Sequence, residues 1–413
     1  MGNTPNIRFK GFTDDWEQRK LSECAGFRRG SFPQPYGNKE WYDGEGAMPF
    51  VQVADVADDM KLVDDTKQKI SKLAQPMSVY ADKGSVLVTL QGSIGRVAIT
   101  QYGAFVDRTV LIFDKYNQDI DKTFWAYIIK EKFIDEARKA PGGTIKTITK
   151  EALSDFDLML PNYDEQKKLG AFLVSIDNLI TLHQRKCDET KKLKKFMLQK
   201  MFPKKNEKKP EIRFAGFTDD WEQRKLGEMG QTYTGLSGKT KDDFGHGQAR
   251  FVTYMNVFSN PISNPEMTEP IEIDPKQNEV EVGDVFFTTS SETPEEVGMS
   301  SILLEKRGKT YLNSFCFGFR PSEKIDSYYL AYMLRSESTR AKIILLAQGI
   351  SRYNISKNKV MEIAVSLPSL DEQKMIGQYF SQLDNLITLH QRKCDEIKEI
   401  KKFMLQNMFP QKG

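Results

Sequence analysis

The stretch that decides the fold is residues 164–200, DEQKKLGAFLVSIDNLITLHQRKCDETKKLKKFMLQK. Its only glycine, Gly170, lies near the start, and the next proline is Pro203. Apolar and small residues recur along it at heptad spacing, which predicts one long helix that pairs with another helix. At 1.5 Å per residue this helix is about 55 Å long, more than a compact domain needs.

The chain contains a long internal repeat. Residues 7–23, IRFKGFTDDWEQRKLSE, return as residues 212–228 with only two differences. Residues 177–203 return as residues 384–410 with 23 of 27 positions identical. The long helix therefore occurs twice, and the two blocks between the repeated ends differ from one another. This pattern predicts a constant frame that carries two different binding domains.

The seam between the paired helices is expected on the apolar stripe of each repeat. The predicted contact residues are Ile176, Leu179, Ile180, His183, Cys187 and Leu193 in the first helix, and Leu383, Leu386, Ile387, His390, Cys394 and Ile397 in the second.

Each block is predicted to be a small α+β domain of about 160 residues, large enough for its own core. Short β-branched runs between glycine and polar turns predict strands. These runs are residues 84–89, 96–100 and 109–113 in the first block, and 283–288, 301–304 and 315–319 in the second. A helical piece, a polar loop and a strand that ends in proline follow, with helices at 123–139 and 325–346 and strands at 156–161 and 363–368.

Composition limits the protein class. The chain has 413 residues, 39% of them hydrophobic and 28% charged, which predicts two to three folded domains. The net charge of +3 indicates no partner by itself, although lysine and arginine gather toward the ends of the long helices. The four cysteines form no C-x-x-C pair, and neither an apolar leader nor an apolar run near 18 residues is present. We expect a reduced, cytoplasmic protein with no membrane partner.

A Pro-x-x-Asp-Glu-Gln motif joins each block to its long helix, at residues 161–166 and 368–373, with the acidic residues in the first turn. The order of block, motif, long helix, second block and second long helix resembles the DNA-specificity subunit of type I restriction-modification enzymes. The duplicated IRF-GFTDDWEQRKL and LITLHQRKCDE segments carry the resemblance, which covers essentially the whole chain.

The resemblance implies an α+β fold in which two α/β target-recognition domains are separated by two long helices that form an antiparallel coiled coil, with a pseudo-twofold internal repeat. The expected boundaries are 1–163 for the first recognition domain, 164–203 for the first helix, 204–211 for a basic linker, 212–370 for the second recognition domain and 371–410 for the second helix.

The resemblance also implies a function and partners. Each recognition domain would read one half of a bipartite, asymmetric site in double-stranded DNA. The helices would set the gap between the halves and dock two methyltransferase subunits, and restriction subunits that translocate DNA would join them. The chain itself would be non-catalytic and bind no cofactor, while the partner subunits would use S-adenosylmethionine, ATP and Mg²⁺ for adenine methylation and ATP-dependent cleavage.

The polar loop before the last strand of each block is the first candidate for reading DNA. Glycine permits close backbone approach, and the flanking residues carry the donors that phosphates and base edges need. The candidates are Thr144, Lys146, Thr147 and Lys150 in the first block, and Ser351, Arg352, Tyr353, Asn354 and Lys357 in the second. Secondary candidates are Arg28, Arg29, Gln91, Ser93, Arg96 and Arg108, and Lys239, Lys241, Arg250, Ser290 and Ser291, any of which equally fits an ordinary surface residue.

Three alternatives compete with this prediction. The run at 235–240, GLSGKT, resembles a phosphate-binding loop, but it is too short and no hydrophobic strand precedes it. The pairs His183 with Cys187 and His390 with Cys394 form a legal zinc set if the helix centres meet, although small core residues explain them better. The third alternative is a coiled-coil scaffold that joins two protein-binding domains. No methyltransferase tetrad of Asn/Asp-Pro-Pro-aromatic type occurs in the sequence.

Overall fold

The computed structural model describes residues 4–139, 150–205 and 207–410. The chain divides into two compact units, which are described separately. Unit 1 comprises Met1–His183 and Arg392–Gly413, and unit 2 comprises Gln184–Gln391. Within the described ranges, no helix combines the length and the hydrophobicity that crossing a membrane requires.

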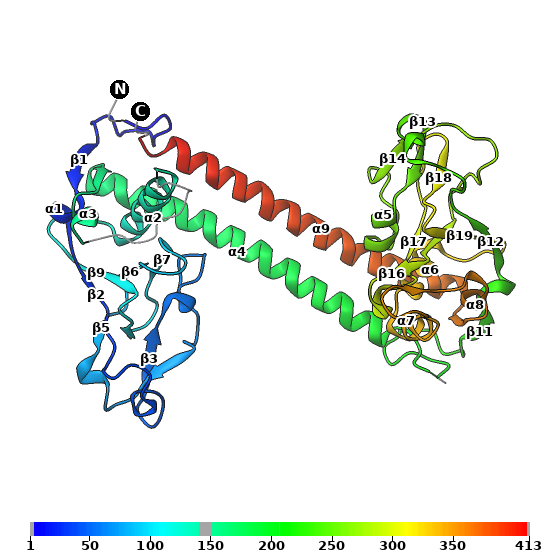
Figure 1. Ribbon diagram of the computed structural model, residues 1–413, viewed down its shortest axis with the longest axis horizontal. Helices are drawn as coiled ribbons and strands as arrows, with labels where there is room; N and C mark the ends of the chain where they lie inside the picture. The colour runs from blue at the N-terminus through cyan, green and yellow to red at the C-terminus, as the bar shows by residue number, and fades with distance from the viewer. Residues whose placement is uncertain (1–3, 140–149, 206, 411–413) are drawn as a thin grey trace. The chain divides into compact units, whose positions relative to one another are not determined.

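The described part of unit 1 has two four-stranded sheets and one two-stranded sheet. Figure 1 labels several of their strands. The first has the order β2-β9-β6-β7, with β2 (Ala25–Arg29), β6 (Val86–Thr89), β7 (Val97–Ile99) and β9 (Val110–Tyr116). The second has the order β4-β3-β8-β5, with β3 (Met48–Val51), β4 (Gln68–Ile70), β5 (Val79–Ala81) and β8 (Ala104–Val106). The third pairs β1 (Glu17–Lys20) with β10 (Asp157–Leu160). The block's helices are α1 (Leu21–Cys24), η1 (Lys39–Trp41), η2 (Val53–Asp55), η3 (Gln75–Met77), α2 (Lys122–Lys139) and α3 (Lys150–Ser154).

Unit 2 has a related layout with different sheets (Figure 1). The main sheet has the order β12-β19-β15-β17, with β12 (Gly230–Thr234), β15 (Val285–Thr288), β17 (Ser300–Ile302) and β19 (Cys316–Pro321). A three-stranded sheet has the order β14-β13-β18, with β13 (Phe244–Val252), β14 (Thr268–Ile271) and β18 (Thr310–Leu312). Two pairs complete it, β16 (Ser290–Ser291) with β20 (Tyr353–Asn354) and β11 (Glu222–Lys225) with β21 (Ala364–Leu367). The helices are η5 (Leu226–Glu228), η6 (Lys241–Asp243), α5 (Tyr254–Ser259), η7 (Pro294–Glu296), α6 (Ser327–Leu334), α7 (Glu337–Ile344) and α8 (Lys357–Met361).

The helix predicted over residues 325–346 is two helices, α6 and α7, which end and begin around Ser336. The Ser336 hydroxyl accepts the backbone N–H of Thr339, so it caps a new helix. The Arg335 guanidinium donates to the carbonyls of Ser300, Val257, Phe258 and Asn260. The break therefore serves packing, because Arg335 ties the end of α6 to the last turn of α5, to Asn260 after it and to the start of β17.

The two long helices are present as predicted. They are α4 (Tyr163–Lys200) and α9 (Leu370–Asn407). Each begins one residue before the predicted start, because the residue ahead of it acts as the cap. The Asn162 side chain accepts the backbone N–H of Glu165, and the Ser369 hydroxyl accepts that of Glu372.

The repeated motifs at the ends of each block bind one another within each unit. In unit 1, Arg8 of the IRF motif donates two hydrogen bonds of 2.7 Å to the buried carboxylate of Glu165 in the Asp-Glu-Gln motif. In unit 2, Arg213 binds Glu372 in the same way. The frame is therefore held by a buried, bidentate ion pair in each unit.

Gly170 lies in the first turns of α4, where another helix approaches closely. A Cβ atom at this position would lie 2.7 Å from the Asp121 carboxylate and 3.0 Å from the Phe124 nitrogen, at the start of α2. Gly377 of α9 occupies the same position against Asp326 and Tyr329 at the start of α6. Both glycines are therefore required by packing.

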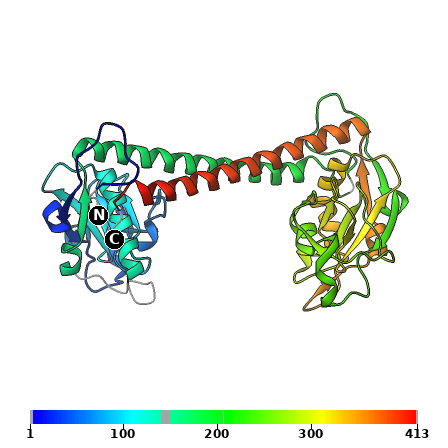
Figure 2. The same ribbon diagram turned by 90° about the horizontal axis from the view of Figure 1, so that it is seen from above.

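In each unit, α4 and α9 run antiparallel and side by side (Figures 1 and 2). In unit 1, Asp177 binds Lys401 at 2.6 Å and the Cys394 thiol points at the Ile180 carbonyl. In unit 2, Asp384 binds Lys194 at 2.5 Å and the Cys187 thiol points at the Ile387 carbonyl. These contacts confirm the antiparallel pair.

Three of the residues predicted to lie in the seam are outside it, because the buried positions follow a different spacing along the helix. Buried and half-buried positions of α4 alternate by four and three residues, at Ile176, Ile180, His183, Cys187, Thr190 and Lys194. Leu179 and Leu193 instead lie on an exposed flank, as does Leu386 of α9. A seam through Leu179 would also have taken in Lys186, whereas the observed one buries Cys187, which costs less desolvation.

The seam residues of α9 follow the same rule. Leu383 and Cys394 are buried, and Ile387, His390 and Ile397 are half-buried.

The last turn of each long helix bonds to the first residues of a block. In unit 1 the Ile7 N–H donates to the Asn407 carbonyl at the end of α9, and in unit 2 the Ile212 N–H donates to the Lys200 carbonyl at the end of α4. Figures 1 and 2 both show the first residues of the described chain beside the end of α9. Phe409 enters the core of unit 1 against Trp16 and Phe124.

Candidate nucleic-acid interface

The loop predicted to read DNA in the second block forms a short hairpin, residues 348–354. Gln348 and Asn354 exchange two backbone hydrogen bonds of 2.9 Å, which close the hairpin at its base. Gly349 has a φ of +144°, and a Cβ atom there would lie 2.0 Å from the Arg352 carbonyl oxygen. Only glycine fits this turn. The hairpin is therefore a defined structure and not a loose connection.

The hairpin pairs with the strand that carries two of the secondary candidates. Strand β20 runs antiparallel to β16, with Ser290 opposite Asn354 and Ser291 opposite Tyr353. The Ile355 N–H donates to the Thr289 carbonyl and extends the contact. The structure thus brings Ser290 and Ser291, which are buried, against the base of the hairpin. The remaining loop candidate, Lys357, begins helix α8.

Arg352 is the candidate with the most available charge in this region. Its guanidinium carbon lies 5.9 Å from the centroid of the exposed Phe315 ring. Within the residues that the structure describes, no carboxylate forms an ion pair with Arg352. Phe315 and Ile350 at the tip, both exposed, were not predicted as contact residues, because their side chains carry no polar group that would indicate DNA contact.

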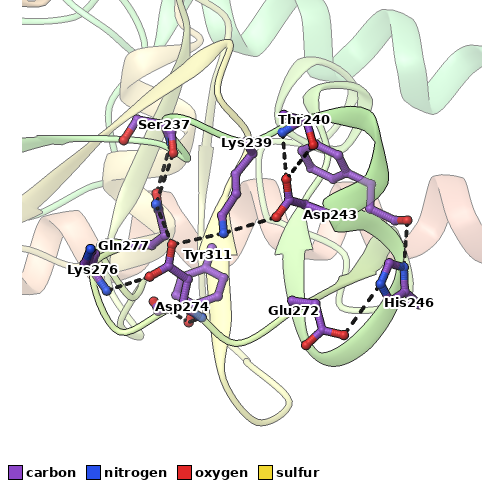
Figure 3. A network of polar contacts seen from close by, with 11 residues as sticks. Ser237, Lys239, Thr240, Asp243, His246, Glu272, Asp274, Lys276, Gln277 and Tyr311 are labelled. Atoms are coloured by element: carbon purple, nitrogen blue, oxygen red, sulfur yellow. Dashed lines mark hydrogen bonds and ion pairs between the residues drawn. The ribbon is translucent and has the colours of Figure 1, made fainter.

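Lys239 and its neighbours form a separate polar network, shown in Figure 3. The Lys239 ammonium lies 3.0 Å from an Asp274 oxygen and 3.6 Å from an Asp243 oxygen, and its side chain is 12% exposed. The backbone N–H of Lys276, together with Lys239 and Gln277, holds the pKa of Asp274 below its usual value. The charge of Lys239 is thus neutralised inside the unit.

This network also answers the phosphate-loop alternative. In a phosphate-binding loop the lysine opens an α-helix whose N–H groups face the ligand. Here Lys239 lies between β12 and the three-residue 3-10 helix η6, and its ammonium already binds two carboxylates. Lys241 is the first residue of η6, and Arg250 of β13 donates to the Thr268 hydroxyl at 2.6 Å.

Part of the first block's candidate set lies outside the described residues. These positions are Thr144, Lys146 and Thr147, and of the loop candidates only the backbone of Lys150, which begins α3, is described.

The other candidates of the first block lie on three segments of unit 1, and Arg108 is in the turn between β8 and β9. Gln91 and Ser93 belong to the turn between β6 and β7, and Arg96 at its end binds Asp58 at 3.0 Å. Arg28 and Arg29 lie on β2, where Arg28 binds Asp114 at 2.5 Å. Arg108 lies over the Phe32 ring, 4.6 Å from its centroid.

The proposed histidine and cysteine pairs lie in the helix seam. Cys187 and Cys394 are fully buried, and each thiol faces a backbone carbonyl of the opposite long helix. Among the described residues, no group of three or more His, Cys, Asp or Glu side chains is placed to hold a metal ion. Because each thiol is buried against a backbone carbonyl, both cysteines act as small packing residues of the seam.

A further polar contact, duplicated in the two units, joins each block to its helix pair. The Tyr332 hydroxyl of α6 donates to Asp384 of α9, 2.8 Å away, while Lys194 of α4 binds the same carboxylate and lies over the tyrosine ring. In unit 1, Tyr127, Asp177 and Lys401 make the same arrangement. These contacts were not predicted, because their three residues are far apart in sequence.

The class of protein follows from comparison with known families. The model of the type I restriction modification DNA specificity domain matches residues 13–192 and again residues 218–399. The chain therefore belongs to this family, and the two matches coincide with the two blocks and their helices. The resemblance seen in the sequence is confirmed, including the non-catalytic role that it implies.

Individual relatives extend this result along the whole chain. The type I restriction enzyme MjaVIII specificity subunit of Methanocaldococcus jannaschii is 24% identical over 410 residues, covering 94% of this chain and 91% of the relative. The crystal structure of the type I restriction-modification S subunit from M. genitalium has a TM-score of 0.62 at 15% identity, covering 99% of this chain and all of that one. A chain from a structural study of complex assembly and conformational transition of the type I R-M system gives 0.55 at 16% identity, with 96% and 98% covered.

Proposed function

We propose that this chain selects the DNA sequence for a type I restriction-modification enzyme, with each block reading one half of a bipartite, asymmetric site. The observation that carries the proposal is the duplicated frame around two different blocks. The frame repeats its ion pair, its caps and its seam contacts in both units, while the candidate reading residues differ. Two half-sites of different sequence require this combination.

The recognition domains occupy residues 1–163 and 212–370, the helices occupy 164–203 and 371–410, and 204–211 links them. In the second block the hairpin 348–354 contacts base edges, and Arg352 is its main cation. In the first block the corresponding loop, with Thr144, Lys146, Thr147 and Lys150, takes this role. Lys239 stabilises the second block from within, because its ammonium binds Asp243 and Asp274.

The exposed flanks of the long helices dock two methyltransferase subunits. In unit 1 the flank presents Leu179 and Leu182 of α4 with Ile400 and Phe403 of α9, each between 37% and 52% exposed. In unit 2 the repeated positions present Leu193, Phe196, Leu386 and Leu389. The same four positions are exposed in both units, so each unit carries an equivalent set of apolar side chains. Two equal surfaces fit two copies of one partner.

The chemistry belongs to the partners. The methyltransferase subunits bind S-adenosylmethionine and act on an adenine in each half-site, and the restriction subunits use ATP and Mg²⁺. This chain contributes sequence recognition and the spacing between the half-sites.

An exchange of one block tests the proposal. The assembly of this chain with its methyltransferase is compared with a variant whose residues 212–370 come from another family member, and methylated adenines are mapped across a genome. We expect one half-site to change and the other to stay. An unchanged site would contradict the proposal. DNA affinity that falls steeply with salt distinguishes DNA reading from a protein-binding scaffold.

A further inference from the structure

The hairpin 348–354 presents an aliphatic side chain that the fold does not use. Ile350 at its tip is 95% exposed, the highest exposure of any large hydrophobic residue that the structure describes. A β-branched residue in such a position gains nothing from the fold, since it buries no surface. The neighbouring Gly349 and the closed base at Gln348 and Asn354 hold the backbone of the tip in place.

The surroundings of Ile350 indicate what its partner is. Two residues along the hairpin, Arg352 lies beside Phe315, and no carboxylate of the described chain pairs with this guanidinium. An exposed cation beside an exposed aliphatic group suits a surface that offers both an acceptor and a methyl group. In the major groove of B-DNA, guanine offers the O6 and N7 acceptors, and the C5 methyl of thymine is the apolar group on the base edges.

We propose that Ile350 packs against the C5 methyl group of a thymine in the half-site that the second block reads. This inference rests on the proposed function and makes it more specific, because it requires an A·T pair in that half-site. An aliphatic side chain has no π face on which a base stacks, so a contact to the thymine methyl fits it better than a stacking role.

Replacement of thymine by uracil tests this contact, since uracil lacks only the methyl group. Duplexes carrying the mapped site, with each thymine of this half-site replaced in turn, are titrated with the assembly of this chain and its methyltransferase. At one position the native assembly should bind uracil about threefold to fivefold more weakly, the value of one buried methyl group. The Ile350→Ala variant should bind thymine with the same loss and show no further change with uracil.

Two comparisons give the result its meaning. Val282→Ala removes an equally unused, 60% exposed aliphatic side chain of the same block, and it should leave both affinities unchanged. The methyl contact is overturned, while the proposed function stands, in either of two cases. In the first, the Ile350→Ala variant binds both duplexes as the native chain does. In the second, it binds both more weakly and still prefers thymine to uracil by the native factor. An assembly without any half-site preference would instead overturn the proposed function.

Discussion

Among the individual side chains, the arginine of the IRF motif has the clearest energetic role. Glu372 has no exposed surface, and Arg213 is the residue that neutralises it. We predict that Arg213→Met lowers the free energy of unfolding of unit 2 by about 3 kcal/mol, because it leaves a buried charge without its partner. Urea denaturation measures the loss.

Two further variants test the cause. Adding Glu372→Gln to Arg213→Met should recover part of the loss, since a neutral amide costs less to bury than a carboxylate. Arg307→Met removes an ion pair whose side chains are 56% and 70% exposed, and it should change nothing measurable. Equal losses for Arg213→Met and Arg307→Met would mean that burial of the pair is irrelevant.

Cys24 predicts a pH dependence. Burial raises the pKa of its thiol from 9.0 to about 11. Between these two values the unfolded chain loses a proton that the folded chain retains, so stability is fully present below pH 9 and falls as the pH rises toward 11. Cys24→Ala should flatten the alkaline part of the stability curve, and thiol alkylation at pH 8 should leave native Cys24 unmodified. Rapid alkylation of the native protein would contradict this.

The sequence indicated the polar loop of the second block, but not all of the residues in and beside it that are proposed to contact DNA. Arg352 and Asn354 have side chains that suggest base reading. The side chains of Ile350 and Phe315 carry no polar group. Their exposure depends on a hairpin whose closure cannot be inferred from the local sequence. Lys239 is the opposite case. The sequence suggested a lysine available to DNA, but its ammonium is paired with Asp274, 35 positions away.

The Tyr-Asp-Lys arrangement links each block to its two long helices. In unit 2 it joins α6, α9 and α4 through a single carboxylate. We predict that Asp384→Asn lowers stability by about 1 to 3 kcal/mol, because Lys194 stays in the seam without an anion. The double variant, Asp384→Asn with Lys194→Met, should lose less stability than the sum of the losses of the two single variants. A double-mutant cycle on thermal unfolding measures this coupling, and strict additivity would rule out the link.

The flank of the helix pair predicts a stoichiometry. Replacing Leu193 and Phe196 with aspartate puts charge on the exposed apolar surface of unit 2 and leaves the corresponding surface of unit 1 intact. We expect the assembly to hold one methyltransferase subunit instead of two, as measured by native mass spectrometry. Lys191→Asp changes an exposed residue on a different side of α4 from Leu193 and Phe196, and this variant should keep both subunits. Retention of two subunits by the double variant would contradict the docking proposal.

The existence of the long helices was predictable, while the choice of seam was not. Leu179 and Ile180 are adjacent in sequence, and both continue a heptad stripe from Ile176. The choice between them depends on which polar residue enters the seam further along. Lys194 is tolerated there because Asp384 of the other helix meets it, and this pairing is a property of the folded pair.

The whole molecule predicts how the recognised site responds to helix length. Four residues inserted into α4 after His183 and four into α9 after Gln391 lengthen both helices where they pass from one unit to the other. The helices grow by about 6 Å, close to two base pairs. Methylome mapping should find the same two half-sites with a longer gap. An unchanged gap would mean that the helices do not set the spacing.

The architecture of the molecule could be predicted because the repeat is printed in the sequence twice. The strands that follow clear apolar runs, such as β6 and β15, were also predictable. Strands such as β3 and β5 were not, since Met48–Val51 and Val79–Ala81 are short and gain their pairing from β8.

The closure of unit 1 by the last turns of α9 sets an order of events during synthesis. Asn6 and Asn407, which bind each other, are 401 positions apart. At ordinary rates of translation, roughly 20 to 80 s separate the appearance of the two ends from the ribosome. Over most of that interval Trp16 and Phe124 lack their contact with Phe409, whereas unit 2 needs no residue beyond Gln391. The first block to be made is the last to be completed, and it needs protection from aggregation in the meantime.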